Sequence, residues 1–84
     1  MVTPEDIQRY IAGGLPCEHL QVEGDGHHFY AVIVSDRFRG LNRVRQHQLV
    51  YGVLGDRMKA EIHALSLQTY TPEAWAEAGG GGRG

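Results

Sequence analysis

The chain is poor in the features that mark several large classes of protein. It has one cysteine, Cys17, in 84 residues, so no disulfide can form within it. Its longest apolar run, residues 29–34, is far shorter than the ~20 residues that a membrane helix needs. The net charge of -2 does not favour a strongly basic nucleic-acid binder, and Glu5 and Asp6 argue against a signal peptide. These absences predict a cytoplasmic protein with no membrane segment.

What is present is an ordinary globular composition in a chain of single-domain length. Hydrophobic residues make up 42% of the chain and charged residues 21%. We expect one domain over residues 1–78. Residues 79–84 comprise five glycines and one arginine, which bury nothing, so this tail is predicted to be disordered.

The first half of the chain predicts a helix followed by a β-hairpin. Thr3 is suited to cap a helix that ends near the glycine pair 13–14. Strands are expected at residues 19–23 and 29–34, with a turn at 24–26. The second strand is apolar on both faces, which is typical of a central strand.

The second half predicts a broken helix, a strand and a last helix. Asn42 can cap a helix that breaks near Gly55 and ends in a turn at Ala60. Residues 62–68 form the third strand, parallel to the second because a helical crossover joins them. With a last helix capped by Thr71, the fold class is α+β: an αββααβα sandwich whose mixed three-stranded sheet has helices on one face. The expected core comprises Ile7, Ile11, Ile33, Val44, Val50, Tyr51, Leu54, Leu65 and Leu67.

Five histidines are the most unusual part of the composition. Histidine titrates near neutral pH and is the commonest metal ligand in proteins. His47 lies on an apolar helix face, which favours a structural role, and His19 is expected to be exposed. His27 and His28 adjoin the flexible turn, and His63 begins the third strand. Their spacing lacks the pattern of a zinc site, so spacing alone does not predict a metal.

Four of the eight basic residues, Arg37, Arg39, Arg43 and Arg45, lie close together before and within the second helix. A basic loop that leads into a helix can contact phosphates, although a solvated face is the simpler interpretation. The chain has no nucleotide-binding motif, and Cys17 has no base near it in sequence. We therefore expect a protein that is not an enzyme.

Four segments, taken in order, resemble the BolA family. They carry the F-x-G, H-x-x-V-Y, I-H-A and T-P-x-x-W patterns, at residues 38–40, 43–51, 62–67 and 70–75. The hairpin at residues 22–29 is most similar to the bacterial IbaG-like branch. The chain departs from the family pattern at Gln46, where an arginine commonly precedes the histidine.

The resemblance implies a class II KH-like fold and a metal-binding function. The chain lacks the G-x-x-G loop by which KH domains hold nucleic acid. BolA-like proteins pair with monothiol glutaredoxins and share a [2Fe-2S] cluster, to which glutaredoxin and glutathione each contribute a thiolate. Carried onto this chain, the I-H-A histidine, His63, is one ligand, and His27 or His28 is the second.

The resemblance therefore implies an adaptor for iron–sulfur cluster trafficking or for iron and stress sensing. The isolated chain would hold no cluster, because it offers two imidazoles and a [2Fe-2S] cluster needs four ligands. The free protein is expected to be a monomer or a weak homodimer. The alternative is a stress-related transcriptional regulator that binds DNA weakly through Arg37, Arg39, Arg43 and Arg45.

Overall fold

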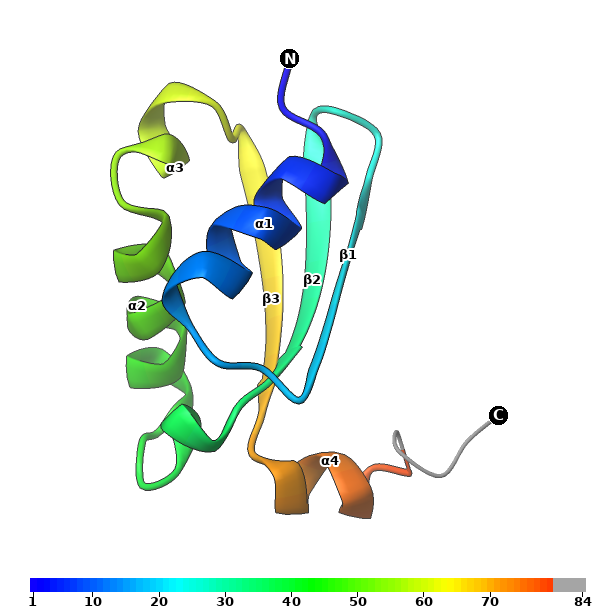
Figure 1. Ribbon diagram of the computed structural model, residues 1–84, viewed down its shortest axis with the longest axis vertical. Helices are drawn as coiled ribbons and strands as arrows, with labels where there is room; N and C mark the ends of the chain where they lie inside the picture. The colour runs from blue at the N-terminus through cyan, green and yellow to red at the C-terminus, as the bar shows by residue number, and fades with distance from the viewer. Residues whose placement is uncertain (80–84) are drawn as a thin grey trace.

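The structure, a computed structural model, describes residues 1–79 as a three-stranded sheet with four α-helices (Figure 1). The elements are α1 (Pro4–Gly14), β1 (His19–Gly24), β2 (His28–Val34), the 3-10 turn η1 (Asp36–Phe38), α2 (Arg43–Leu54), α3 (Arg57–Ala60), β3 (Ala64–Tyr70) and α4 (Pro72–Glu77). This order confirms the predicted α+β class. Most of the predicted tail, residues 80–84, lies outside the described residues. Within residues 1–79, no helix is both long and apolar enough to cross a membrane.

The sheet has the order β1-β2-β3, so β2 is the central strand, as predicted. β1 is antiparallel to β2, and β2 is parallel to β3. α1 crosses one face of the sheet, α2 packs beside it, and α4 lies beyond the far end of β3 (Figure 1). His28 at the start of β2 pairs with Ala64 at the start of β3. The parallel register therefore brings the residue that precedes β3 to the hairpin end of the sheet.

Local signals place the helix ends where the sequence predicts them. The Thr3 hydroxyl accepts from the Asp6 amide at 3.1 Å, and the Asp6 carboxylate accepts from the Thr3 amide at 2.9 Å, which is a capping box. Asn42 and Thr71 cap α2 and α4 with their side-chain oxygens. Gly55 has a φ of 58°, in the left-handed region that favours glycine, and it separates α2 from α3.

The predicted strand at residues 62–68 is wrong at both ends, because β3 runs from Ala64 to Tyr70. Ile62 is buried in the core, with 4% of its surface exposed, although it lies in the connection before the strand. His63 occupies the same connection rather than the first position of β3. An apolar residue in a loop and one in a strand look alike in the sequence when both contact the core.

The core lies between the sheet and the helices α1 and α2. The predicted core residues that are fully buried are Ile7, Ile11, Ile33, Val50 and Leu54, while Leu65 and Leu67 are partly buried beside them. The prediction is wrong for Val44 and Tyr51, which are 64% and 39% exposed. Val50 and Leu54 form the buried side of α2, so Val44 and Tyr51 face solvent. The predicted set also lacks Phe29 and Phe38, the two largest fully buried side chains.

Gln46, where the chain departs from the family pattern, connects α2 to β3. Its side-chain nitrogen donates to the Leu41 carbonyl at 2.9 Å, and its side-chain oxygen accepts from the Thr69 hydroxyl at 2.6 Å. Both bonds are partly buried, where polar groups need partners. Gln46 therefore fixes the start of α2 against the sheet.

Candidate metal centre

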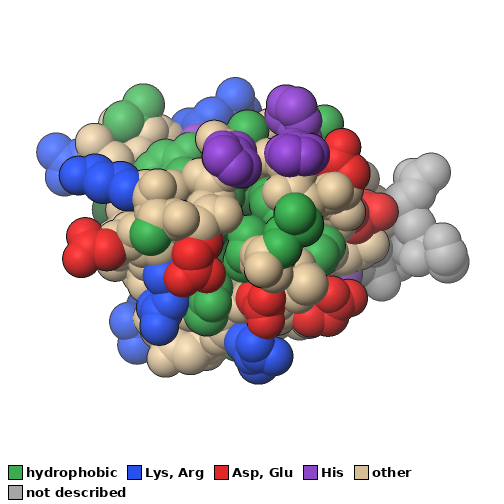
Figure 2. Space-filling view, turned by 90° about the horizontal axis from the view of Figure 1, so that it is seen from above, with side chains coloured by type: hydrophobic (Ala, Val, Ile, Leu, Met, Phe, Trp, Pro, Cys, Tyr) green, Lys and Arg blue, Asp and Glu red, His purple; other side chains and the backbone are tan. Residues whose placement is uncertain are grey.

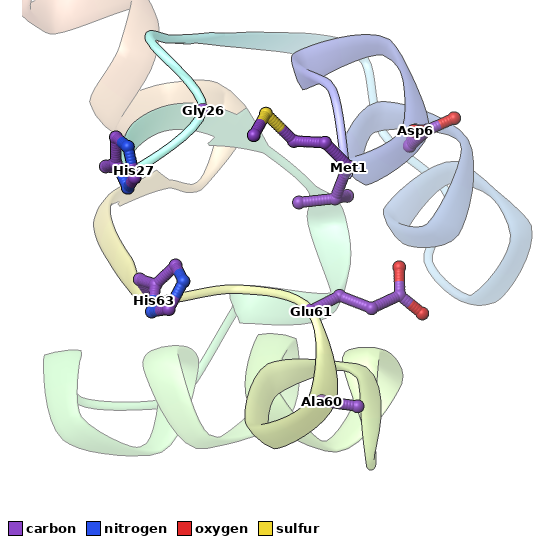
Figure 3. Close-up of a pocket in the computed structure, with 8 residues that line it drawn as sticks. Met1, Asp6, Gly26, His27, Ala60, Glu61 and His63 are labelled. Carbon is purple, nitrogen blue, oxygen red and sulfur yellow. The ribbon is translucent and has the colours of Figure 1, made fainter.

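His27 and His63 face each other at the hairpin end of the sheet. Their ring centroids are 5.9 Å apart, and the ring planes are inclined by 40°. His27 comes from the β1–β2 turn and His63 from the connection before β3, and the two side chains lie on the same side of the hollow in Figure 3. Both residues are exposed. Two accessible imidazoles this close can ligate a shared metal group.

Asp25 holds the turn that presents His27. Its carboxylate oxygen Oδ1 accepts from the backbone N–H of His28 at 2.8 Å and of His27 at 2.9 Å. These two bonds hold the pKa of Asp25 below its usual value, and the bond from His28 has the larger effect. Gly26 has a φ of 100°, which lets the chain reverse direction. The turn is thus an ordered support for His27.

His28 takes a different position from His27. It is the first residue of β2, and side chains alternate between the two faces of a strand. Phe29 points into the core, so His28 lies on the opposite sheet face together with Tyr30, which is 56% exposed. The ring contact with His63 is made by His27. Figure 2 looks onto this end of the molecule and shows histidine side chains gathered there.

An open hollow of about 470 Å³ adjoins the histidine pair (Figure 3). Its lining includes Asp6 and Glu61, whose carboxylates already have partners. Asp6 bonds to Thr3 and Arg9, and Glu61 accepts from a tyrosine hydroxyl. No group of three or more His, Cys, Asp or Glu side chains in residues 1–79 is arranged to hold a metal ion. The pair therefore offers two potential ligands, and any further ligands would have to come from another molecule.

The remaining histidines and the cysteine lie away from this pair. His19, expected to be exposed, is half-buried because it stacks on Trp75 with centroids 4.9 Å apart. His47 is half-buried on α2 and lines a groove beside β3. Burial raises the pKa of the half-buried Cys17 thiol, which donates to the Leu15 carbonyl. A thiol with a raised pKa is a poor nucleophile and a poor ligand at neutral pH.

The four arginines differ in what they contact. Arg39 pairs with Glu73 of α4 at 2.8 Å and with Asp36, and these bonds, first the one to Glu73, raise the pKa of Arg39. Arg37, Arg43 and Arg45 are exposed. A phosphate contact by Arg39 would have to compete with two carboxylates, so the accessible basic surface is smaller than the sequence indicates.

Comparisons with known proteins agree with the fold. The family model described as BolA-like protein matches residues 14–74. The chain is 39% identical over 72 residues to the acid stress protein IbaG of Escherichia coli K12. The aligned region covers 84% of this chain and 86% of that protein. It is 40% identical over 57 residues to the DNA-binding transcriptional regulator BolA of the same strain, covering 68% of this chain and 54% of that protein.

A solved structure of a BolA protein homologue from Coxiella burnetii has the same fold. Its TM-score is 0.83 with 47% sequence identity, over 90% of this chain and 99% of that chain. The arrangement of the sheet and helices is therefore shared over nearly the whole described chain.

Proposed function

This chain belongs to the BolA family, and from that premise we propose that it is a non-enzymatic adaptor that shares a [2Fe-2S] cluster with a monothiol glutaredoxin. The observation that carries the proposal is the exposed pair formed by His27 and His63, with ring centroids 5.9 Å apart. The cluster is the cargo of this complex, in trafficking or in iron and stress sensing.

The donor set fits one end of such a cluster. Two histidines can replace two cysteines on one iron of a [2Fe-2S] centre. His27 and His63 are both exposed at an open hollow, so a partner can approach them. Because residues 1–79 contain no group of three or more potential ligands arranged for a metal, the other ligands must come from outside. A glutaredoxin cysteine and the thiolate of glutathione supply them in the proposed complex.

An incomplete ligand set has a thermodynamic consequence. The affinity of this protein for the cluster and its affinity for the glutaredoxin are linked, because each depends on ligands that the other completes. The isolated protein is thus expected to hold no cluster. Sharing the cluster with the glutaredoxin needs no catalytic residue in this chain, only an accessible and correctly spaced pair of imidazoles.

The test mixes the purified protein with a cluster-loaded monothiol glutaredoxin and glutathione. Visible absorption and circular dichroism report the cluster's ligands. We expect His63→Ala to change the spectrum and to shorten the lifetime of the cluster. The matched control is His19→Ala, because His19 lies at the end of β1 that is far from the hairpin and from His63. This variant should behave as the wild type. A wild-type spectrum and lifetime for His63→Ala would show that the ligand assignment is wrong.

A second function, transcriptional regulation through DNA, is favoured by the exposed arginines around the start of α2. Arg37, Arg43 and Arg45 are exposed, and the similar E. coli BolA is named a DNA-binding transcriptional regulator. Each phosphate contact would make the binding more sensitive to salt. Loss of salt-dependent DNA binding in an Arg43→Gln/Arg45→Gln variant, with cluster sharing absent from the wild type, would favour this function.

A further inference from the structure

Tyr10 of α1 contacts both ends of the short helix α3. The Arg57 guanidinium carbon lies 4.2 Å from the centroid of the Tyr10 ring, and the Tyr10 hydroxyl donates to the Glu61 carboxylate at 3.0 Å. Arg57 is the first residue of α3, and Glu61 follows its last residue. Residues four apart lie on the same side of a helix, so a single side chain can bind both. Tyr10 therefore holds the whole of α3 against α1.

The helix α3 depends on such contacts for its position. It has four residues, none of them buried, and the N-cap residue Asp56 makes no side-chain capping bond. A helix of this length is not stable on its own. Its placement must come from tertiary contacts, which are the Tyr10 interactions, the packing of the partly buried Met58 against the core and the burial of the adjacent Ile62.

The segment held in this way leads directly to His63. Figure 3 shows the side chains of Glu61 and His63 pointing in different directions, Glu61 toward α1 and His63 toward His27. Ile62 between them enters the core, so three consecutive side chains take three directions. The pairing of β3 with β2 starts at Ala64, so His63 precedes the paired residues. The position of the His63 ring therefore depends on how Glu61 and Ile62 are anchored.

We propose that Tyr10 is a positioning residue for His63. By binding Arg57 and Glu61, it fixes residues 57–63 and so sets the separation of the His27 and His63 rings. The importance of Tyr10 for cluster binding rests on the proposed function. Its effect on the separation of the His27 and His63 rings is independent of that function. Residues that orient metal ligands typically change metal affinity by 10-fold or more when they are replaced.

Two variants test the proposal. Tyr10→Phe removes the hydroxyl and keeps the ring beneath Arg57, and Glu61→Ala removes the exposed carboxylate without touching the core. Glu61→Gln keeps an oxygen acceptor and should restore the wild-type behaviour. Tyr70→Phe is the matched control, because the Tyr70 hydroxyl bonds to Gln68 at the far end of β3.

The first readout is NMR of the free protein. In Tyr10→Phe and Glu61→Ala we expect a weaker nuclear Overhauser effect between the His27 and His63 rings. We also expect amide exchange to rise about 10-fold at residues 58–61 alone, whose backbone N–H groups are hydrogen-bonded within the segment that Tyr10 holds, as for local opening. An unchanged ring contact and unchanged exchange would overturn the proposal. So would an equal rise at every amide of the sheet, since this would show only a general stabilising role.

The second readout is the lifetime of the cluster shared with the glutaredoxin. We expect both variants to lose it about 10-fold faster than the wild type, the lower end of the effect of replacing a ligand-orienting residue. Wild-type lifetimes in both variants would overturn the role of Tyr10 in cluster binding. Failure of the wild type to share any cluster would instead overturn the proposed function, and the NMR measurements would still decide whether Tyr10 positions His63.

Discussion

Gly24 and Phe29 pair across the β1–β2 hairpin so closely that no side chain fits at position 24. A Cβ atom there would lie 2.5 Å from the His28 carbonyl oxygen and 2.5 Å from a ring carbon of Phe29. Phe29 is fully buried, so its ring cannot move aside without disturbing the core. This contact fixes the base of the turn that carries His27.

We predict that Gly24→Ala destabilises the protein by about 1–3 kcal/mol, the usual effect of overpacking. Denaturant unfolding measures the change. Gly13→Ala is the matched control, because a Cβ at position 13 meets nothing within 4 Å and Gly13 lies within α1. That control should be neutral or stabilise by up to about 1 kcal/mol, as expected for glycine to alanine in a helix. Equal effects of the two substitutions would contradict the prediction.

Leu54 and Val44 test which side of α2 faces the core. Leu54 is 1% exposed and Val44 is 64% exposed. Leu54→Ala should destabilise by about 2–5 kcal/mol, because it leaves a cavity in the core. Val44→Ala should change the free energy of unfolding by less than about 0.5 kcal/mol. A loss below about 1 kcal/mol for Leu54→Ala would show that the buried side of α2 is assigned incorrectly.

The two histidines at the hairpin should differ in their effect on the shared cluster. His27 makes the ring contact with His63, whereas His28 lies on the sheet face opposite Phe29. We predict that His27→Ala shortens the lifetime of the cluster in the glutaredoxin complex and that His28→Ala changes it little. Circular dichroism in the visible range measures both. A larger effect of His28→Ala would assign the second ligand to His28.

The Thr3–Asp6 capping box should make stability depend on pH in the acid range. Hydrogen bonds hold the pKa of Asp6 below the usual 3.8: the bond from the Thr3 backbone N–H has the largest effect, and the bond with the Thr3 hydroxyl has the second largest. The stabilisation is complete above that unfolded value and is lost as the pH falls below it, toward the lower folded pKa. Thermal unfolding between pH 2 and 6 should show this loss, and Asp6→Asn should reduce it. Asp56→Asn is the control, because Asp56 makes no capping bond; an equal change there would contradict the assignment.

Much of the local structure could be predicted because it depends on neighbouring residues. Thr3, Asn42 and Thr71 cap helices with their own side chains, and Gly55 adopts the backbone conformation that ends α2. The apolar character of residues 29–34 indicates a central strand, and the sheet order confirms it, although Tyr30 on the open face of the sheet is exposed. The ordered motifs were sufficient to identify the family.

The position of the site within this fold required the tertiary structure. Parallel pairing of β2 and β3 places His63 beside His27, and the strand alternation directs His28 elsewhere. The Tyr10–Glu61 bond joins residues 51 positions apart, so no spacing in the sequence reveals it. Local patterns report how a segment interacts with its own neighbours along the chain. By itself, the sequence determined the helix caps, the strand types and the family; the convergence of two histidines depended on the relative placement of remote segments, which only the packed core decides.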